Sequence, residues 1–210
     1  MKQKIMKNKK LSFNRVIGCL LGSLLIFFIT GCRVDDSNVI PVKEVLLPDW
    51  IDSKIIEIDD ASRRSYKLDA VNDIVIHYIG NPQTTALENY NYFASPRSVV
   101  SSHFLIGLEG EVIQCIPLDE WSSASNWRNN DTISIEVCHP DETGEFLDAT
   151  YDALVQLTSW LCDAYNLDTE QIIRHYDITG KDCPRYFVRN EDEWVTFKNN
   201  VKEYLEINHF

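Results

Sequence analysis

A short run of β-branched residues, Ile74-Val75-Ile76, is the feature that most constrains this fold. Three consecutive apolar residues break the alternation of a strand with one face in water, so we expect a strand buried on both faces. The run ends at His77, and α/β folds tend to bind ligands where buried strands end. Taken alone, His77 is better explained as a structural histidine whose ring nitrogens bond the backbone.

Other segments predict the elements that would cover this strand. Three segments have the apolar pattern of strands: 102–108, 111–116 and 132–138. Three segments have the apolar spacing of helices. The first is 84–94, with Leu87, Tyr90 and Phe93 on one side, and the second is 148–166, capped by Asp148 or Thr150. The third follows residues 190–193, and these four residues resemble a capping box. Glycine at 110 suits a tight hairpin turn between the first two strands. These elements predict one compact domain of about 160 residues.

The N-terminal residues have the features of an export signal. Residues 1–15 carry six Lys and Arg and no acidic residue, and 16–30 are apolar but short for a membrane span. They lead into Ile29-Thr30-Gly31-Cys32, which resembles a bacterial lipobox, in which the cysteine takes the lipid. An uncleaved anchor and an ordinary signal peptide are the alternatives.

We therefore expect an exported lipoprotein that faces the cell wall and is held at the membrane through Cys32. Its parts would be a signal peptide over 1–31, a lipid-anchored linker over 32–47 and the folded domain over 48–210. Two or three acyl chains anchor a protein stably where one would not.

Removal of residues 1–31 would make the remaining chain strongly acidic. The whole sequence holds 20 Lys and Arg against 32 Asp and Glu, a net charge of −12, and loss of the six basic residues leaves 14 against 32, a net of −18. Such a domain is not attracted to nucleic acid or to anionic polymers. We expect no nucleic-acid partner, and a lipid tether rather than a basic surface as the means of localisation.

Three reactive side chains lie close together in 172–186, IIRHYDITGKDCPRY. We expect a strand that ends at Arg174 and His175, then a loop marked by Asp177, Thr179 and Gly180, with Pro184 preventing a helix from starting at once. His175 and Cys183 are of the types that bind zinc, and the ammonium of Lys181 suits an anionic intermediate. Two ligands do not make a site, and a surface histidine with a buried cysteine is the alternative.

A third ligand is available at the end of the buried strand. His77, His175 and Cys183 together would leave a fourth tetrahedral position for water, which is typical of catalytic zinc. Glu136 lies mid-strand on the face opposite the aliphatic residues of 132–138. If that face lines a cleft, poor hydration raises the basicity of the carboxylate. A solvated glutamate on an outer sheet face is the alternative.

Four segments, in their order and spacing, resemble the zinc-dependent N-acetylmuramoyl-L-alanine amidases (amidase type 2): IVIHYIGNP, SSHFLIGLEGEVIQCIPLDEW, TISIEVC and IIRHYDITGKDCPRYF. These enzymes share a fold with peptidoglycan recognition proteins. The resemblance covers about Pro48 to Tyr204. It implies an α/β domain with a single central mixed β-sheet flanked by helices.

The same resemblance implies a set of functional residues and a substrate. Zinc would be held by His77, His175 and Cys183. Glu136 matches the general base of many members, and Lys181 matches the lysine that stabilises the oxyanion. The substrate would be peptidoglycan, cut at the amide between N-acetylmuramic acid and L-alanine for wall remodelling or lysis.

Two positions depart from the family pattern. Ser102 stands where some relatives have a tyrosine before the equivalent of His103, which leaves the proton transfer to Glu136. Residues 122–125 read SSAS where many relatives have an Ala-His or similar dipeptide, which removes one substrate contact.

Other functions stay open on the sequence. A non-catalytic peptidoglycan-binding protein typically lacks a zinc ligand, most often the cysteine, and this chain keeps all three. A zinc peptidase cutting within the stem peptide would use the same residues, and a purely structural lipoprotein would bind no zinc. We expect a monomer, because no segment has the pattern of an association surface.

The remaining cysteines and histidines are expected to be structural. Cys115 and Cys138 lie in strand-like runs and Cys162 on a helix, which suits buried free thiols and few or no disulfides. His103 is expected in a strand as a structural residue, with a substrate contact as the alternative, and His139 in a loop. The tryptophans of 121–131 would stack on sugar rings or cover the core edge.

Overall fold

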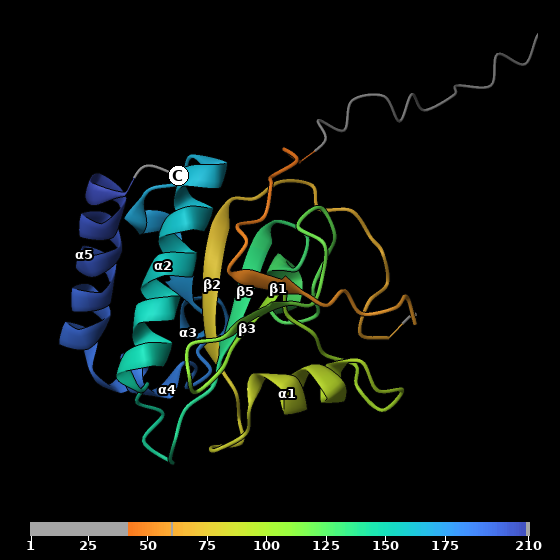
Figure 1. Ribbon diagram of the computed structural model, residues 1–210, viewed down its shortest axis with the longest axis horizontal. Helices are drawn as coiled ribbons and strands as arrows, with labels where there is room; N and C mark the ends of the chain where they lie inside the picture. The colour runs from red at the N-terminus through yellow and green to blue at the C-terminus, as the bar shows by residue number, and fades with distance from the viewer. Residues whose placement is uncertain (1–41, 60, 209–210) are drawn as a thin grey trace, which may run out of the picture. The chain divides into compact units, whose positions relative to one another are not determined.

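Six strands form one mixed sheet in the order β1–β4–β3–β5–β2–β6 (Figure 1). In chain order the strands are β1 (Ile51–Ser53), β2 (Asp73–Tyr78), β3 (Phe104–Ile106), β4 (Val112–Gln114), β5 (Thr132–Val137) and β6 (Ile172–Arg174). Within this sheet β3 and β4 are antiparallel, as predicted for a hairpin, and the other neighbours are parallel. The predicted central mixed sheet is confirmed.

Helices cover both faces of the sheet (Figure 1). The long helix α2 (Asp148–Tyr165) lies against one face and carries α5 (Glu191–Ile207) on its outer side, and α1 (Ala86–Phe93) lies against the other face. Alternate strand residues separate into two apolar clusters: one holds Ile74, Ile76, Ile133 and Ile135 with the long helices, and the other holds Leu105 and Ile113 with α1. The predicted burial of the central strand on both faces is confirmed, because Ile74, Val75 and Ile76 are all fully buried.

Four shorter helices complete the fold of the described residues. They are η2 (Asn126–Arg128), η3 (Thr169–Gln171), α3 (His175–Thr179) and α4 (Arg185–Arg189). Both α3 and α4 fall in the segment after β6, where we predicted a loop. Asp177 explains α3, because its carboxylate accepts the Arg174 N–H and also pairs with the Arg174 guanidinium. Pro184 directly precedes α4 rather than delaying it, since proline is well tolerated where the first helical N–H groups have no partner.

The helix termini also differ from the predictions in detail. Leu147, without a side-chain cap, precedes α2, and the Thr150 hydroxyl instead donates to the Gly107 carbonyl of the hairpin. The expected capping box of α5 does not form, because the Asn190 amide donates back to Tyr186. In α1, Leu87 is 51% exposed, since the buried face is formed by Ala86, Asn89 and Phe93.

The structure describes residues 42–59 and 61–208, which belong to one compact unit, Asn38–Phe210. The predicted signal peptide, Cys32 and most of the predicted linker lie outside the described residues. At the described end of that linker, Val42, Val45 and Leu47 pack against the core, so this part contacts the domain instead of standing apart from it. Among the described helices, none is long and apolar enough to cross a membrane.

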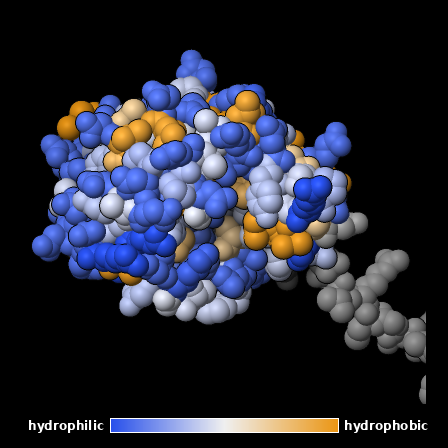
Figure 2. Space-filling view, turned by 90° about the horizontal axis from the view of Figure 1, so that it is seen from below, coloured by the Kyte–Doolittle hydropathy of each residue, from blue (hydrophilic) through white to orange (hydrophobic). Residues whose placement is uncertain are grey.

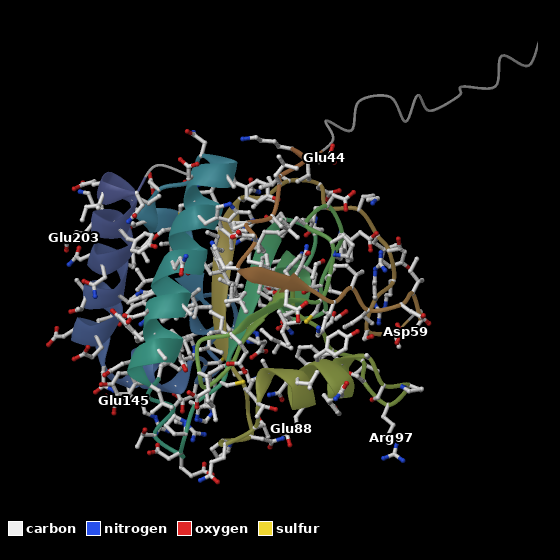
Figure 3. The ribbon with its side chains drawn as sticks, viewed as in Figure 1. Glu44, Asp59, Glu88, Arg97, Glu145 and Glu203 are labelled. Carbon is white, nitrogen blue, oxygen red and sulfur yellow. The ribbon has the colours of Figure 1, made fainter. Side chains whose placement is uncertain are left out.

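The acidic composition is visible at the surface of the domain. Glu44, Glu145 and Glu203 are exposed and project from three separate parts of the domain (Figure 3). The face shown in Figure 2 is mostly hydrophilic, with small scattered apolar patches. The apolar residues are therefore concentrated in the two clusters that flank the sheet.

Candidate metal centre and active site

The register of the sheet brings three of the predicted site residues together. His77 of β2 is paired with Glu136 of β5, so the two side chains are neighbours on the same face. On the other side of β2, Ile76 is paired with Arg174, the last residue of β6. His175 follows immediately and therefore lies beside His77, 98 residues away in the chain.

A tight return of the chain brings Cys183 to the two histidines. Gly180 ends α3 with a φ of +75°, a left-handed conformation that glycine adopts without strain. The Tyr176 N–H then donates to the Cys183 carbonyl at 2.9 Å, which holds the returning segment against the start of α3. The thiol is thereby buried beside His77.

The three ligand atoms form a compact cluster. The Nδ1 atoms of His77 and His175 are 3.1 Å apart, the Cys183 Sγ is 3.9 Å from the first of them, and all three lie within 4.8 Å of one another. Two nitrogens held tetrahedrally about 2.0 Å from one zinc ion would be roughly 3.3 Å apart, and a nitrogen and a sulfur slightly more. The spacing of the cluster fits a zinc ion.

The far nitrogens of the two rings meet oxygen atoms. The His175 Nε2 lies 2.8 Å from the Asn126 Oδ1, and the His77 Nε2 lies 3.4 Å from the Ser125 hydroxyl. When both Nε2 atoms carry their protons, the lone pairs of the two Nδ1 atoms face each other at 3.1 Å. Such an arrangement is stabilised by a cation between them, which is a second reason why the residues fit a metal.

The electrostatics of the cluster also favour a cation. Burial, with the charges of His175 and Lys181 adding, holds the pKa of His77 well below its usual value, and burial with Lys181 lowers the pKa of His175 to about 4. Both rings are therefore neutral near pH 7, as metal ligation requires. Burial, with the Glu136 charge adding, raises the pKa of the Cys183 thiol to about 12, so without a cation this ligand stays protonated.

A cavity of about 270 Å³ opens in front of the cluster and is lined by His77, Asn81, Tyr92, Glu136, His175 and Lys181. Burial raises the pKa of Glu136 to about 8, an effect that the positive charge of Lys181 opposes. The Glu136 Oε2 atom is buried and has no hydrogen-bond partner among the residues that the structure describes. A proton acceptor and a cation thus face the same space as the metal-binding cluster.

Comparisons with known proteins identify the family of this chain. The sequence profile of the N-acetylmuramoyl-L-alanine amidase family matches residues 67–186, more than half of the chain. This range contains the positions of the predicted metal-binding and catalytic residues. The chain belongs to this amidase family. The resemblance of four sequence segments to N-acetylmuramoyl-L-alanine amidases is confirmed at the level of the family.

Individual members of the amidase family match over most of the domain. The chain is 30% identical to the N-acetylmuramoyl-L-alanine amidase BlyA of Bacillus subtilis, and the match covers 70% of this chain and 45% of that protein. It is 29% identical to the amidase CwlL of Bacillus licheniformis, and that match covers 71% of this chain and 46% of that protein. The chain thus spans about half the length of these relatives.

A solved structure supports the fold. A mutant endolysin from Bacillus subtilis superposes with a TM-score of 0.64 at 25% identity, and the match covers 72% of this chain and 97% of that one. Nearly the whole of that protein therefore has a counterpart in this domain, which confirms the amidase fold.

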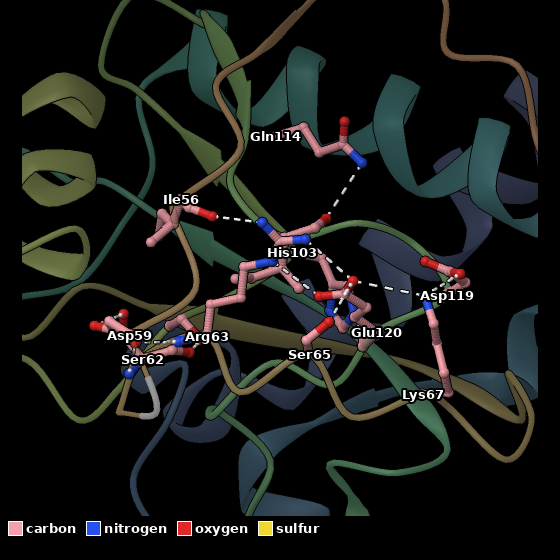
Figure 4. A network of polar contacts seen from close by, with 12 residues as sticks. Ile56, Asp59, Ser62, Arg63, Ser65, Lys67, His103, Gln114, Asp119 and Glu120 are labelled. Carbon is pink, nitrogen blue, oxygen red and sulfur yellow. Dashed lines mark hydrogen bonds and ion pairs between the residues drawn. The ribbon is translucent and has the colours of Figure 1, made fainter.

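Other residues of this amidase-family domain are structural, as predicted. His103 is fully buried between Ser134 and the Glu120 carbonyl (Figure 4), and His139 lies after β5 with its ring nitrogens 2.6 Å from the carbonyls of Ile79 and Asp141. The cysteines of the described residues, Cys115, Cys138, Cys162 and Cys183, are all free and buried.

The two tryptophans of the polar loop have different environments. Trp121 is partly buried against the core and makes an edge contact with Tyr66, so it covers the core edge. Trp127 is 68% exposed and lies in η2, next to the residue that contacts His175.

The departures from the family pattern have local explanations. The Ser102 hydroxyl donates to the carbonyl of Phe104, the first residue of β3, so it is used locally and does not replace a tyrosine hydroxyl. Ser122 bonds the Ser134 hydroxyl at 2.6 Å, whereas Ser123 lines the cavity.

The residues that contact the far side of the histidines have no clear signal in the sequence. Asn126 reaches His175 across 49 residues of sequence and Ser125 reaches His77 across 48. The polar composition of 121–131 was the one available signal, and it does not indicate which side chain meets which ring. Asn81 and Tyr92 were missed as cavity residues for the same reason.

Proposed function

We propose that this protein hydrolyses the amide bond between N-acetylmuramic acid and L-alanine in peptidoglycan, with one zinc ion bound by His77, His175 and Cys183. The observation that carries the proposal is the convergence of these three ligand atoms within 4.8 Å, beside Glu136 and Lys181, at one open cavity. Family membership supports the substrate and the bond. A binding protein without catalysis would have no use for the carboxylate and the ammonium.

The chain's own residues account for the proton and charge movements. A bound zinc ion would supply Lewis-acid polarisation of the scissile carbonyl and acidify water. Glu136, half-buried at the cavity, takes the proton from the attacking water and delivers it to the leaving amine. Burial raises the pKa of Glu136 to about 8, near neutral pH, which suits a group that both accepts and donates a proton. The ammonium of Lys181 stabilises the negative charge that develops on the carbonyl oxygen.

Digestion of purified peptidoglycan by the full-length protein, with mass analysis of the products, tests this function. We expect stem peptides that begin with L-alanine, with their release abolished by a chelator and restored by zinc. New cuts within stem peptides that remain attached to sugar would mean a peptidase instead. Retention on the insoluble wall without any release would mean a binding protein.

We further propose that the protein is exported and held at the membrane by a lipid on Cys32, acting as a monomer. The lipobox-like residues 29–32 and the basic, then apolar, residues before them support this. Growth of an expressing bacterium with labelled palmitate should label the wild-type protein and leave Cys32→Ala unlabelled and released from membranes. Equal labelling of both proteins would refute lipidation at Cys32.

A further inference from the structure

The loop that enters β5 presents two consecutive polar residues to the metal cluster. Asn126 places its Oδ1 atom 2.8 Å from the His175 Nε2, and Ser125 places its hydroxyl 3.4 Å from the His77 Nε2. Neither residue faces the Nδ1 atoms that converge on Cys183. Each side chain therefore contacts its histidine from the side away from the metal.

The shorter of these contacts determines where the proton on His175 lies. A carboxamide oxygen can only accept a hydrogen bond, so the Nε2 atom facing it must carry the proton. In a neutral imidazole the other nitrogen then has the free lone pair. The contact with Asn126 selects the tautomer in which Nδ1 of His175 is available as a ligand.

The backbone around Asn126 is held by contacts outside the cluster. Asn126 has a φ of +56°, a left-handed conformation that costs free energy in a residue other than glycine and persists where its surroundings impose it. The Ser125 N–H donates to the Asn129 Oδ1 at 2.7 Å. Arg128 pairs with Asp73 of β2 and with Asp131, which ties the loop to the central strand.

We propose that Asn126 is a positioning residue of the metal centre, which holds His175 in the orientation and tautomer that bind zinc through Nδ1. This inference rests on the proposed zinc function and adds to it a residue that the family resemblance did not indicate. Ser125 has the corresponding place at His77, with a longer contact and a smaller effect. Outer partners of this kind typically change metal affinity by about 10- to 100-fold.

The choice of substitution must separate the carboxamide from the backbone strain. Asn126→Gly removes the side chain and adopts the positive φ without strain, so folding is preserved. Asn126→Asp keeps an oxygen acceptor at the same place. Asn130→Ala is the matched control in the same loop, because the Asn130 amide donates to Asp69 and not to the cluster.

Two measurements on the full-length protein test the inference. Zinc affinity is measured by competition with a chromophoric chelator, and we expect a 10- to 100-fold higher Kd for Asn126→Gly, with near wild-type values for Asn126→Asp and Asn130→Ala. Side-chain ¹⁵N NMR of the zinc-free protein reports the tautomer directly. We expect His175 to be protonated at Nε2 in the wild type and to be a mixture of tautomers in Asn126→Gly.

The outcomes separate this inference from the proposed function. If Asn126→Gly binds zinc with the wild-type Kd and keeps a single His175 tautomer, the inference is wrong, although the zinc site is still supported. In that case water would replace the carboxamide at this exposed position. If the wild type binds no zinc, the proposed function fails first. A loss of affinity that is equal in Asn130→Ala would indicate a general disturbance of the loop and would also overturn the inference.

Discussion

The cluster of His77, His175 and Cys183 and the network around His103 are two buried histidine sites with opposite bonding. At His103, Nδ1 accepts the Ser134 N–H at 3.0 Å and Nε2 donates to the Glu120 carbonyl at 2.8 Å. At the cluster, the Nδ1 atoms of the two rings face each other and a thiol. Both ring nitrogens of His103 are thus bonded to protein groups, whereas the Nδ1 atoms of His77 and His175 are available to a metal ion.

The network around His103 also shows how a closed polar site is built. Glu120 is buried and receives hydrogen bonds from the Arg63 guanidinium and the Ser65 hydroxyl, which connect the segment after β1 to the loop after β4 (Figure 4). Every group in this chain of contacts has a protein partner, so the network stabilises the fold. In the cluster, by contrast, the Nδ1 atoms of the two histidines have no protein donor among the described residues that satisfies both lone pairs, and a metal ion would bind these lone pairs.

Removal of a cluster ligand should have the largest effect on activity. We expect Cys183→Ala to reduce kcat/KM for peptidoglycan by more than about 10³-fold, roughly 4 kcal/mol of transition-state stabilisation, because the metal is no longer held. Turbidity loss of purified cell walls measures this. Activity within tenfold of the wild type would show that the thiol is not a ligand.

Lys181→Met should produce a smaller loss without affecting the metal. We expect kcat to fall by about 10²- to 10³-fold, because one group that stabilises the oxyanion is lost, while bound zinc stays at one per chain. Lys181 is exposed, so the free energy of unfolding should change by less than about 0.5 kcal/mol. A variant that lost zinc as well as activity would contradict this separation of roles.

His103→Gln should have the reverse pattern. Loss of the two hydrogen bonds within the buried network should lower the free energy of unfolding by about 2–3 kcal/mol. Zinc content and the activity of the folded fraction should stay near wild type. Urea denaturation followed by tryptophan fluorescence measures the stability, and zinc loss at unchanged stability would show that the two sites are not separate.

The pH dependence of stability provides the smallest and most specific difference. Burial lowers the pKa of His103 to about 4 from 6.5, so on acidification the unfolded chain takes up a proton that the folded protein does not. The contribution of His103 to the free energy of unfolding is therefore fully present above pH 6.5 and is lost as the pH falls from 6.5 towards 4. His103→Gln should reduce that slope by about 1.4 kcal/mol per pH unit, and an unchanged slope would rule out a buried neutral His103.

The two sites differ in how far the sequence predicts them. His77 and Glu136 end or lie within strongly patterned strands, so their position follows from strand periodicity. His175 and Cys183, in the segment after β6, were candidates by residue type alone, and the family resemblance implied their role as ligands. The helix α3 was missed because five residues held by an Arg174–Asp177 pair have no helical periodicity. Asn126 was missed because its contact with His175 joins distant segments of the chain. The contact also depends on a left-handed backbone conformation, which an asparagine in the sequence does not by itself predict.

The exposed face of α1 provides a further lesson. The apolar residue Leu87 was expected inside, yet the buried positions are a small residue, an amide and an aromatic ring: Ala86, Asn89 and Phe93. The Asn89 amide is satisfied by the Thr84 hydroxyl and the Thr85 carbonyl, so a polar residue can occupy the core side. Hydrophobicity alone therefore misassigns a short helix whose inner face carries its own hydrogen bonds.

Substitution of cobalt for the metal, followed by electronic absorption spectroscopy of the full-length protein, tests the central claim most directly. One Co²⁺ per chain bound by two nitrogens and the Cys183 thiolate should show a sulfur-to-cobalt charge-transfer band in the near ultraviolet together with visible bands of a tetrahedral site. We predict that both are present in His103→Gln and that Cys183→Ala loses the charge-transfer band. A wild-type spectrum without that band, or its loss in His103→Gln alone, would contradict the account.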